Sequence, residues 1–542
     1  MHLRLLTTLA LSLARAAFGS HKCVREDHQH TDPELELSTG ASQTRLGVSW
    51  SDTPKDEFHG VPSPPLEVFP LVVSGPSTNR VDLVFFSDGY LEEEREKFLA
   101  DALRLALDVS SNQTFYTVKP LMNFWAAFTP SKESGVGVGG KAKDTPFGLY
   151  RPGTELRGVY YAKPKVAGAA CASLGEQCDY PILLGNDPLY GGLGGRFTVI
   201  TPSLANGPLI LRHELGHSII KVGEEYDGGF AYFGVNAHAD ATKPPSWAHW
   251  LSSESPAGLS PRIERSAMPL QAYAWTLLNT SAPWAAVFSS SGAYARHLVR
   301  FSLSGVPAAA DLRVTLDGAD LGWAPRAEIG KDRWHYDVHI DKPLRAGEHT
   351  VAFHLLNAER EGKTIDGAQL CSVEIIEFGD ESEFISTPGH YGLYPTFSLD
   401  NATTYRPTNE DCLMRIVTTP NFCKACLEGL WLALLRDVRL IDALEEECTP
   451  EPTLALRLVP LAHLRAAPVP GLDDTYSITW THDGVAVPAW ANQTRVVAPG
   501  PGKYDVRVTY NTREVRQDPD DLLSAHAEYT VSPDSCIVQE VI

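Results

Sequence analysis

Positive charge is scarce in this chain of 542 residues, because 46 lysines and arginines stand against 67 aspartates and glutamates, for a formal net charge of -21. Such an acidic surface repels nucleic acids and anionic membranes, so neither is expected as a partner. After the first twenty residues there is no run of eighteen uninterrupted apolar residues, and residues 535–542 match no lipid-anchor signal, so we expect no membrane anchor. Long low-complexity tracts are also lacking, which argues against a mostly disordered protein.

The N-terminus has the pattern of a secretory signal. Arg4 supplies positive charge, residues 5–13 are largely apolar, and Ala14-Arg15-Ala16 fits an A-x-A cleavage site. We therefore expect a signal peptide over 1–20, a secreted, extracellular protein, and a flexible or pro-like arm over 21–65.

Nine cysteines in an exported chain predict disulfides. Cys171 and Cys178 are placed to close a short loop. The sequence does not fix the pairing of a second group, for which two bridges are expected: Cys412, Cys423, Cys426 and Cys448. The C-x-x-C at 423–426 favours a structural disulfide over a zinc knuckle or redox site. Sequons predict glycosylation on surface loops at Asn112, Asn279, Asn401 and Asn492.

Hydrophobic periodicity outlines the remaining organisation. A strand over 81–86, a helix ending near 109 and a strand over 123–129 form one unit, and further strands are expected at 180–184 and 197–201. From 259 to 385 the pattern is β-rich. His335 and His339 would share one face of a strand there, and we expect them to be surface histidines rather than ligands.

A second β-rich region begins near residue 450. Residues 502–508 resemble residues 347–353, which supports two immunoglobulin-like sandwiches. Between the two regions, apolar residues at helical spacing over 427–441 predict an amphipathic helix that packs against the rest of the protein.

The chemistry concentrates in His213-Glu214-Leu215-Gly216-His217, within a helix predicted over 208–222. Histidines four residues apart lie on one helical face and can both reach one Zn²⁺ at ~2.0–2.1 Å. Glu214, displaced around the helix, can hold a water and accept its proton during attack on a peptide carbonyl. We therefore expect zinc as cofactor, His213 and His217 as ligands and Glu214 as catalytic base. The alternative is two satisfied histidines on a core helix.

A third ligand must come from beyond this helix. If the helix continued, Glu224 would lie ~16 Å along the axis from His213, too far to share the ion. Gly223 is a natural helix terminator, after which the chain can turn back. Negative charge at a helix C-terminus opposes the helix dipole, and a metal would relieve that repulsion. The residues alone leave three candidates open: Glu224, Glu225 and Asp227.

Residues 211–228 (LRHELGHSIIKVGEEYDG) resemble the zinc motif of the IgA-peptidase family, secreted metallopeptidases with a metzincin-like catalytic fold. The family pattern ends in an acidic pair and a tyrosine, here Glu224, Glu225 and Tyr226. The resemblance implies Glu225 as third ligand, with Glu224 as the alternative, and Met414 as a hydrophobic floor beneath the zinc. It extends over 68–250 and 390–448. The spacing departs from the usual metzincin motif, which would place its glycine at Ile220 and its ligand at Gly223.

The expected fold is therefore α+β and multidomain. A metzincin-like zinc peptidase domain over 66–258 and 386–449 is interrupted by an inserted β-sandwich over 259–385 and followed by an immunoglobulin-like β-sandwich module over 450–542. The expected function is a secreted zinc-dependent endopeptidase whose protein or peptide substrate pairs with the strand near 197–201.

Two other functions remain open. One is a non-catalytic extracellular binding protein on a zinc-peptidase scaffold, although the intact Glu214 argues against it. The other is a zinc amidase or esterase that uses the same water. The sequence indicates neither the identity of the substrate nor an oligomeric state.

Overall fold

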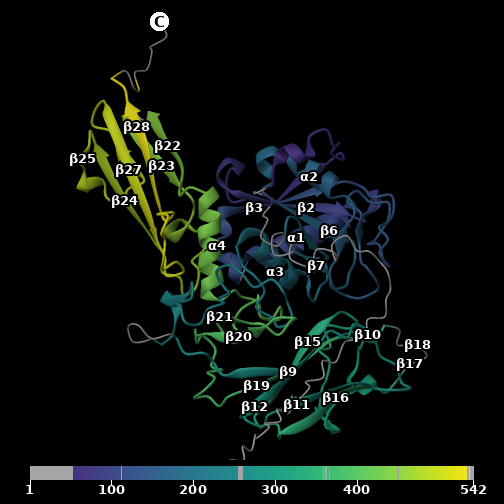
Figure 1. Cartoon of the computed structure of the whole chain (residues 1–542). Helices are drawn as coiled ribbons and strands as arrows, with labels where there is room; N and C mark the ends of the chain where they lie inside the picture. The colour runs from purple at the N-terminus through teal and green to yellow at the C-terminus, as the bar shows by residue number, and fades with distance from the viewer. Residues whose placement is uncertain are drawn as a thin grey trace, which may run out of the picture. The chain divides into compact units, whose positions relative to one another are not determined.

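The computed structural model describes residues 50, 53–111, 113–253, 261–357, 359–360, 363–364, 367–448, 451–533 and 536. The predicted signal peptide, most of the predicted arm, Asn112 and Cys23 lie outside these residues. The described chain is rich in sheets, as Figure 1 shows. Its α-helices are α1 (Arg95–Ser111), α2 (Pro164–Ala172), α3 (Gly207–Ile219) and α4 (Lys424–Asp437).

A six-stranded sheet organises the N-terminal half. Its order is β1-β3-β2-β6-β8-β7, and β2, β3, β6 and β8 run parallel, whereas β1 and β7 pair antiparallel at the two edges. The strands are β1 (Glu67–Val72), β2 (Val81–Asp88), β3 (Met122–Phe128), β6 (Tyr180–Gly185), β7 (Gly192–Leu193) and β8 (Thr198–Ile200). The predicted strands at 81–86, 123–129, 180–184 and 197–201 are thus confirmed to within two residues at each end.

Helices cover both faces of this sheet. Strand β2 is buried along its whole length, so its side chains alternate between two apolar cores. Leu83 and Phe85 join the core that includes α1 and α3, and Val84 and Phe86 join the core that includes α2. Figure 1 shows α2 on one side of the sheet and α1 and α3 on the other. A hairpin of β4 (Leu149–Tyr150) and β5 (Tyr160–Tyr161) accompanies this part.

Helix α3 follows β8 and carries the two histidines of the motif. Pro208 stands in its first turn, a position where a missing N–H costs nothing. The helix ends at Ile219, earlier than the expected 222, because Ile220 is already extended and Val222 pairs with Gly234. Gly223 is therefore not the helix terminator. Its role is close packing, since a Cβ there would lie 2.4 Å from the carbonyl oxygen of Ala231.

The predicted insertion contains two sheets that share one apolar core. One has the order β10-β19-β12-β15, with β9 also on β19, and the other has the order β11-β16-β13-β14. The bounds are β9 (Ser266–Ala272), β10 (Thr276–Leu277), β11 (Trp284–Ser290), β12 (Arg296–Ser304), β13 (Leu312–Leu316), β14 (Ala319–Asp320), β15 (Trp334–Ile340), β16 (Gly347–Leu355) and β19 (Gln369–Phe378). A short hairpin of β17 (Glu359–Arg360) and β18 (Lys363–Thr364) completes the region. A second hairpin, of β20 (Tyr394–Phe397) and β21 (Thr403–Arg406), follows the insertion in the chain.

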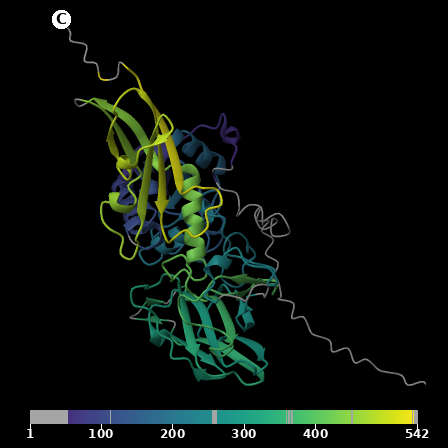
Figure 2. The ribbon, with the colours of Figure 1, turned by 90° about the vertical axis from the view of Figure 1, so that its left-hand side faces the viewer.

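The C-terminal part forms sheets of order β22-β23-β26 and β25-β24-β27-β28, drawn in yellow-green to yellow in Figure 2. The strands are β22 (Ile441–Cys448), β23 (Pro452–Leu458), β24 (Thr475–His482), β25 (Val485–Ala486), β26 (Arg495–Val497), β27 (Gly502–Asn511) and β28 (Ser524–Val531). Because β22 pairs with β23, this part begins at Ile441 rather than near 450. Helix α4 is correspondingly shorter than expected and packs Trp431 against Tyr510, with ring centroids 5.4 Å apart.

The disulfides confirm one expectation and correct another. Cys171 is bonded to Cys178, but Cys448 is bonded to Cys536 rather than to a cysteine of its own sequence cluster. Four cysteines of the described chain are free: Cys371, Cys412, Cys423 and Cys426.

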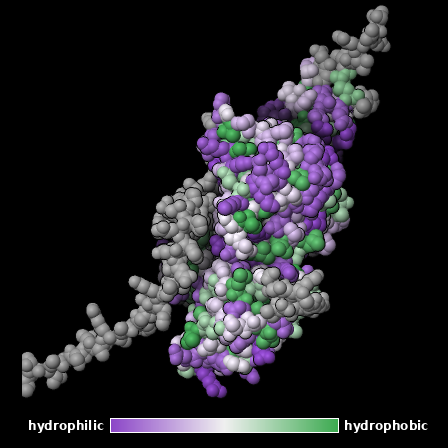
Figure 3. Space-filling model, turned by 90° about the vertical axis from the view of Figure 1, so that its right-hand side faces the viewer, coloured by the Kyte–Doolittle hydropathy of each residue, from purple (hydrophilic) through white to green (hydrophobic). Residues whose placement is uncertain are grey.

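The surface agrees with the acidic composition. The sequon asparagines Asn279, Asn401 and Asn492 are exposed, so glycosylation at these sites remains a prediction. On the face drawn in Figure 3, polar residues predominate and apolar ones are scattered. Within the described ranges, every helix is too short or too polar to span a bilayer.

Candidate metal centre

The two histidines of α3 direct the same ring atom toward one point. Nε2 of His213 lies 3.3 Å from Nε2 of His217. Their Nδ1 atoms face main-chain carbonyls, that of His213 at 3.1 Å from Leu413 and that of His217 at 3.1 Å from Val222. Because a carbonyl oxygen only accepts, each Nδ1 carries the proton and each Nε2 lone pair is left for a shared ligand.

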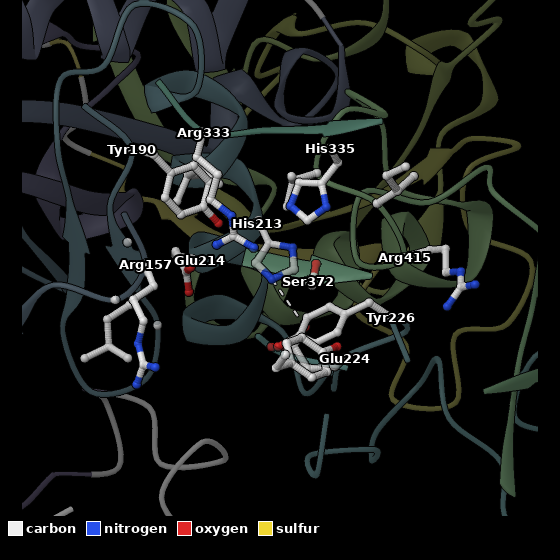
Figure 4. A pocket seen from close by; sticks show the side chains of 18 of the residues that line it. Arg157, Tyr190, His213, Glu214, Glu224, Tyr226, Arg333, His335, Ser372 and Arg415 are labelled. Atoms are coloured by element: carbon white, nitrogen blue, oxygen red, sulfur yellow. Dashed lines mark ion pairs between the residues drawn. The ribbon is translucent and has the colours of Figure 1, made fainter. Parts of the chain in front are cut away.

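Glu224 closes the third side of this site. Its carboxylate lies 3.0 Å from Nε2 of His217 and 3.3 Å from Nε2 of His213, and Figure 4 draws the ion pair with His213. All three side chains are largely buried. Two imidazoles and one carboxylate are a ligand set of catalytic zinc sites, which keep a further position for water. The residues therefore fit a zinc ion.

Glu225 points away from the histidines, which differs from the expectation that it is the third ligand. Its carboxylate accepts a hydrogen bond of 2.9 Å from Asn236 and lies 3.7 Å from Sγ of Cys426. The cause is the backbone after α3. The N–H of Glu224 donates to Ala231 and the N–H of Glu225 donates to Met414, on opposite sides, so the side chains also diverge. The geometry thus favours Glu224, the alternative, over Glu225.

Electrostatic attraction between the two imidazoles and the Glu224 carboxylate holds the three candidate ligands together. Burial alone would lower the pKa of His217, but the Glu224 carboxylate outweighs it and raises that pKa to about 9. The pKa of His213 shifts in the same direction against the same burial effect. Burial would raise the pKa of Glu224, yet the two imidazoles hold it well below its usual range. A divalent cation at this point would take over the role of the protons.

Glu214 lies beside the histidines under a glycine-containing loop. A Cβ on Gly194 would lie 2.6 Å from one carboxylate oxygen of Glu214, and a Cβ on Gly192 would lie 3.1 Å from the other. Burial raises the pKa of Glu214, although the two imidazoles oppose it. The glycines of residues 190–195 therefore allow the backbone to approach a carboxylate that is a ready proton acceptor.

The supporting residues named from the sequence surround this group. Met414 is fully buried, and its sulfur lies 3.1 Å from where a Cβ on Gly216 would be, beneath the helical turn between the histidines. Tyr226 is 37% exposed and lines the pocket in front of the histidines. Gly223 donates to Asn236 at 3.0 Å, which fixes the turn that brings Glu224 back.

The pocket at this site has a volume of about 320 Å³, and the insertion forms part of its wall. Trp275, Arg333 and His335 come from the insertion, so the expectation that His335 is a surface histidine is wrong. His339, two residues further along β15, is exposed. Burial and the neighbouring Arg333 and Arg300 hold the pKa of His335 well below its usual value.

Asp332 attaches the insertion to the part of the chain that carries α3. Its carboxylate accepts hydrogen bonds from the N–H of Tyr190 at 2.6 Å, Oγ of Ser203 at 2.6 Å and Nδ2 of Asn206 at 2.9 Å. These contacts reach the loop before β7 and the residues before α3. No sequence pattern predicts these contacts, since Asp332 belongs to no motif.

Comparison with solved structures finds matches of low similarity. A family 35 carbohydrate binding module from an environmental isolate is 14% identical, with a TM-score of 0.13, over 29% of this chain and 96% of that one. A GH2 beta-galacturonidase from Eisenbergiella tayi bound to glycerol is 11% identical, with a TM-score of 0.12, over 48% of this chain and 42% of that one. Because these TM-scores are very low, neither match indicates the fold or the function of this chain. No curated protein matches the chain.

Part of the chain matches a protein-family model. Residues 69–249 match the model described as IgA Peptidase M64, and this range includes α3, Glu214 and Glu224. The resemblance inferred from the sequence is therefore confirmed: residues 69–249 of this chain are a peptidase domain of the IgA peptidase M64 family.

Proposed function

We propose that this protein is a secreted, zinc-dependent metalloendopeptidase that hydrolyses peptide bonds of extracellular proteins. The observation that supports it best is the convergence of Nε2 of His213, Nε2 of His217 and the Glu224 carboxylate in an M64 domain, with Glu214 beside them. A zinc ion held there supplies a Lewis acid that polarises a carbonyl and makes a bound water more acidic.

Glu214 provides the proton transfers. Its carboxylate accepts one proton from the attacking water while the water oxygen bonds to the peptide carbon. It then donates that proton to the peptide nitrogen as the carbon–nitrogen bond breaks, which releases an amine and regenerates the carboxylate. The raised pKa of Glu214 suits the first step, because a stronger base accepts the proton more readily.

The substrate main chain has an edge strand available. The expected strand near 197–201 is inside the sheet, since β8 pairs with β6 on one side and β7 on the other. The edge is β7, Gly192–Leu193, whose glycine also lies against Glu214. An extended peptide that adds to this edge would gain main-chain hydrogen bonds next to the proposed base.

The test compares cleavage of an unbiased peptide library by the purified secreted chain and its Glu214→Gln variant, with zinc measured in both. We expect internal cleavage by the wild type, a loss of about 10²–10⁴-fold in the variant, and unchanged zinc content. Equal activity of the two proteins would overturn the role of Glu214. A zinc-loaded wild type that cleaves no peptide would instead support the extracellular binding protein.

A further inference from the structure

A second group of ligand-type side chains lies on the opposite side of the Glu224–Glu225 segment. The ligand atoms of Glu225, Cys412, Cys423 and Cys426 all lie within 4.8 Å of one another. None of the four residues is more than 2% exposed. They come from three separate stretches: the loop after α3, the turn that contains Met414, and the start of α4.

The cysteines of this group are not joined to one another. Sγ of Cys412 lies 3.7 Å from Sγ of Cys426, whereas a disulfide needs ~2.05 Å. With three cysteines, any single bridge would leave one thiol beside a buried carboxylate. A disulfide therefore does not satisfy the group as a whole.

The Glu225 carboxylate has one oxygen that a cation could bind. One of its carboxylate oxygens accepts from Asn236, but the other is buried without a hydrogen-bond partner. Arg415 donates to the main-chain carbonyl of Glu225 and pairs its charge with Asp227 instead. Within the described chain, no arginine or lysine forms an ion pair with the Glu225 carboxylate. Arg406 attracts this carboxylate without forming an ion pair with it, and a buried carboxylate that lacks a direct cationic partner is costly unless something binds it.

Two of the three thiols lie at the start of a helix. Cys423 is the N-cap residue of α4 and Cys426 lies in its first turn, where the positive end of the helix dipole stabilises thiolates. The N–H of Cys423 points at Sγ of Cys412 at 3.4 Å. Hydrogen bonds of this kind orient sulfur ligands and support their negative charge.

We propose that Cys412, Cys423, Cys426 and Glu225 bind a second zinc ion in a closed structural site. Three thiolates and one carboxylate fill all four positions of tetrahedral zinc, and soft sulfur ligands select zinc over magnesium or calcium. No position remains for a substrate or a water. The bound ion would tie the loop that carries Glu224 and the turn that carries Met414 to the first turn of α4. This site does not depend on the proposed peptidase activity.

Two measurements on the unaltered secreted chain test the site without any variant. Metal analysis should find two zinc ions per chain. Alkylation under denaturing conditions, with chelator and without reductant, should find Cys412, Cys423 and Cys426 all as free thiols. A disulfide between any two of these cysteines, or a zinc content that falls to zero when His213 and His217 are both replaced by alanine, would overturn the proposal.

Variants then separate the two ions. His213→Ala with His217→Ala should retain one zinc, and its cobalt-substituted form should keep a strong thiolate-to-cobalt absorption in the near ultraviolet. Cys423→Ser should lose that absorption and one zinc, whereas Cys371→Ser, the matched buried free thiol of the insertion, should keep both ions. A Cys423→Ser protein that folds and still holds two zinc ions contradicts the proposed ligand set.

The charged residues of the pocket support a second inference. It is separate from the cysteine site and rests on the proposed function. Of the four pocket arginines, Arg300 pairs with Asp337 and Arg415 pairs with Asp227, but Arg157 and Arg333 form no ion pair in the described part of the chain. Both of these guanidinium groups lie over the Trp275 ring, at 5.3 Å and 4.8 Å from its centroid. Arg333 is only 8% exposed and is fixed by a 2.8 Å hydrogen bond to Ser302.

We infer that Arg157 and Arg333 bind an acidic side chain of the substrate close to the scissile bond. A partly desolvated guanidinium stacked on an aromatic ring retains in-plane N–H donors for a carboxylate. Both residues share one pocket with Glu214 and the histidines, which limits the acidic residue to positions near the cleaved bond. The pocket also contains the carboxylates of Glu214, Glu224 and Glu374, and Arg157 and Arg333 are its arginines that have no ion pair in the described chain.

The test uses matched peptides with Glu or Gln at each position around a cleaved bond. The wild type should cleave the Glu peptide at least about tenfold faster at one position, in line with a charged hydrogen bond worth ~1.5–3 kcal/mol. Arg333→Gln should lose that preference but still cleave the Gln peptide, and Arg326→Gln, an exposed control, should keep it. Cleavage without any Glu preference contradicts this inference alone, whereas no cleavage of any peptide contradicts the proposed function.

Discussion

The carboxylates of the adjacent residues Glu224 and Glu225 serve two different groups of side chains: that of Glu224 lies 3.0 Å from Nε2 of His217, and that of Glu225 lies 3.7 Å from Sγ of Cys426. The same few residues of chain therefore border both candidate metal sites. A shift in the position of one glutamate can therefore move the other, because a single peptide bond joins them.

Substitution of the two glutamates should have different effects. Glu224→Gln should weaken zinc binding at the histidines by more than ~100-fold and should abolish cleavage. Loss of a residue that only orients a ligand lowers metal affinity by up to ~100-fold, and loss of a ligand itself should lower it further. Glu225→Gln should leave the zinc at His213 and His217 in place. Metal titration with activity assays on both variants checks this. Retention of the histidine zinc in Glu224→Gln together with its loss in Glu225→Gln would restore Glu225 as the third ligand.

Removal of metal should stop the proposed reaction reversibly. A chelator that takes zinc from the open pocket should abolish cleavage, and added zinc should restore it, because the two histidines remain oriented by their hydrogen bonds to Leu413 and Val222. Zinc held by the cysteines should leave more slowly, since their side chains, unlike those of the histidines, are not among the residues that line the pocket. Timed metal analysis during chelation should therefore show two phases. Full activity after loss of the faster phase would contradict the zinc mechanism.

Gly194→Ala should impair the proposed base without loss of zinc. The added Cβ would lie 2.6 Å from the Glu214 carboxylate and displace it, so we expect kcat to fall by about 10²-fold or more. Gly500→Ala is the control, because a Cβ there meets no atom within 4 Å. Kinetics with metal analysis measure both effects. Unchanged kcat in Gly194→Ala would show that Glu214 tolerates displacement.

Asp332→Ala should loosen the insertion. It would leave the three buried donors of Tyr190, Ser203 and Asn206 without their acceptor, at a cost of about 2–4 kcal/mol in the free energy of unfolding. Asp320→Ala, on the exposed strand β14, should change it by less than ~0.5 kcal/mol. Urea unfolding gives both values. Equal stability of the two variants would mean that Asp332 does not anchor the insertion.

Glu374 should make the folded protein less stable as the pH rises. Burial, and then the nearby Asp227, raises its pKa from 4.5 to about 7, although Arg300 and Arg415 oppose the shift. Above pH 4.5 the unfolded chain releases this proton while the folded chain keeps it, so stability is lost between pH 4.5 and about 7. Glu374→Gln should thus be more stable than the wild type at pH 8, by about 1–3 kcal/mol, and not below pH 4.5. Urea midpoints at both pH values test this, with exposed Glu348→Gln as the flat control.

Features that depend on local pattern could be predicted from the sequence. The strands of the first sheet follow from apolar runs, and the position of α3 follows from its periodicity and motif. The choice between Glu224 and Glu225 could not be predicted, because it depends on which N–H bonds to Ala231 and which to Met414. The pairing of Cys448 with Cys536 spans 88 residues. The pocket contributions of Arg333 and His335 depend on how the insertion is anchored by Asp332, which no local pattern encodes.

The hydrogen bond from His213 to Leu413 has a consequence for the order of biosynthesis. The two residues are 200 positions apart, and the segment that supplies Leu413 and Met414 is made only after the whole insertion. At ~5–20 residues per second, the histidine pair emerges from the ribosome roughly 10–40 s before the residues that orient it. A partly made chain therefore has both histidines but lacks the contact that fixes the ring of His213. On this architecture the candidate metal centre can be completed only after 413 of the 542 residues have been synthesised.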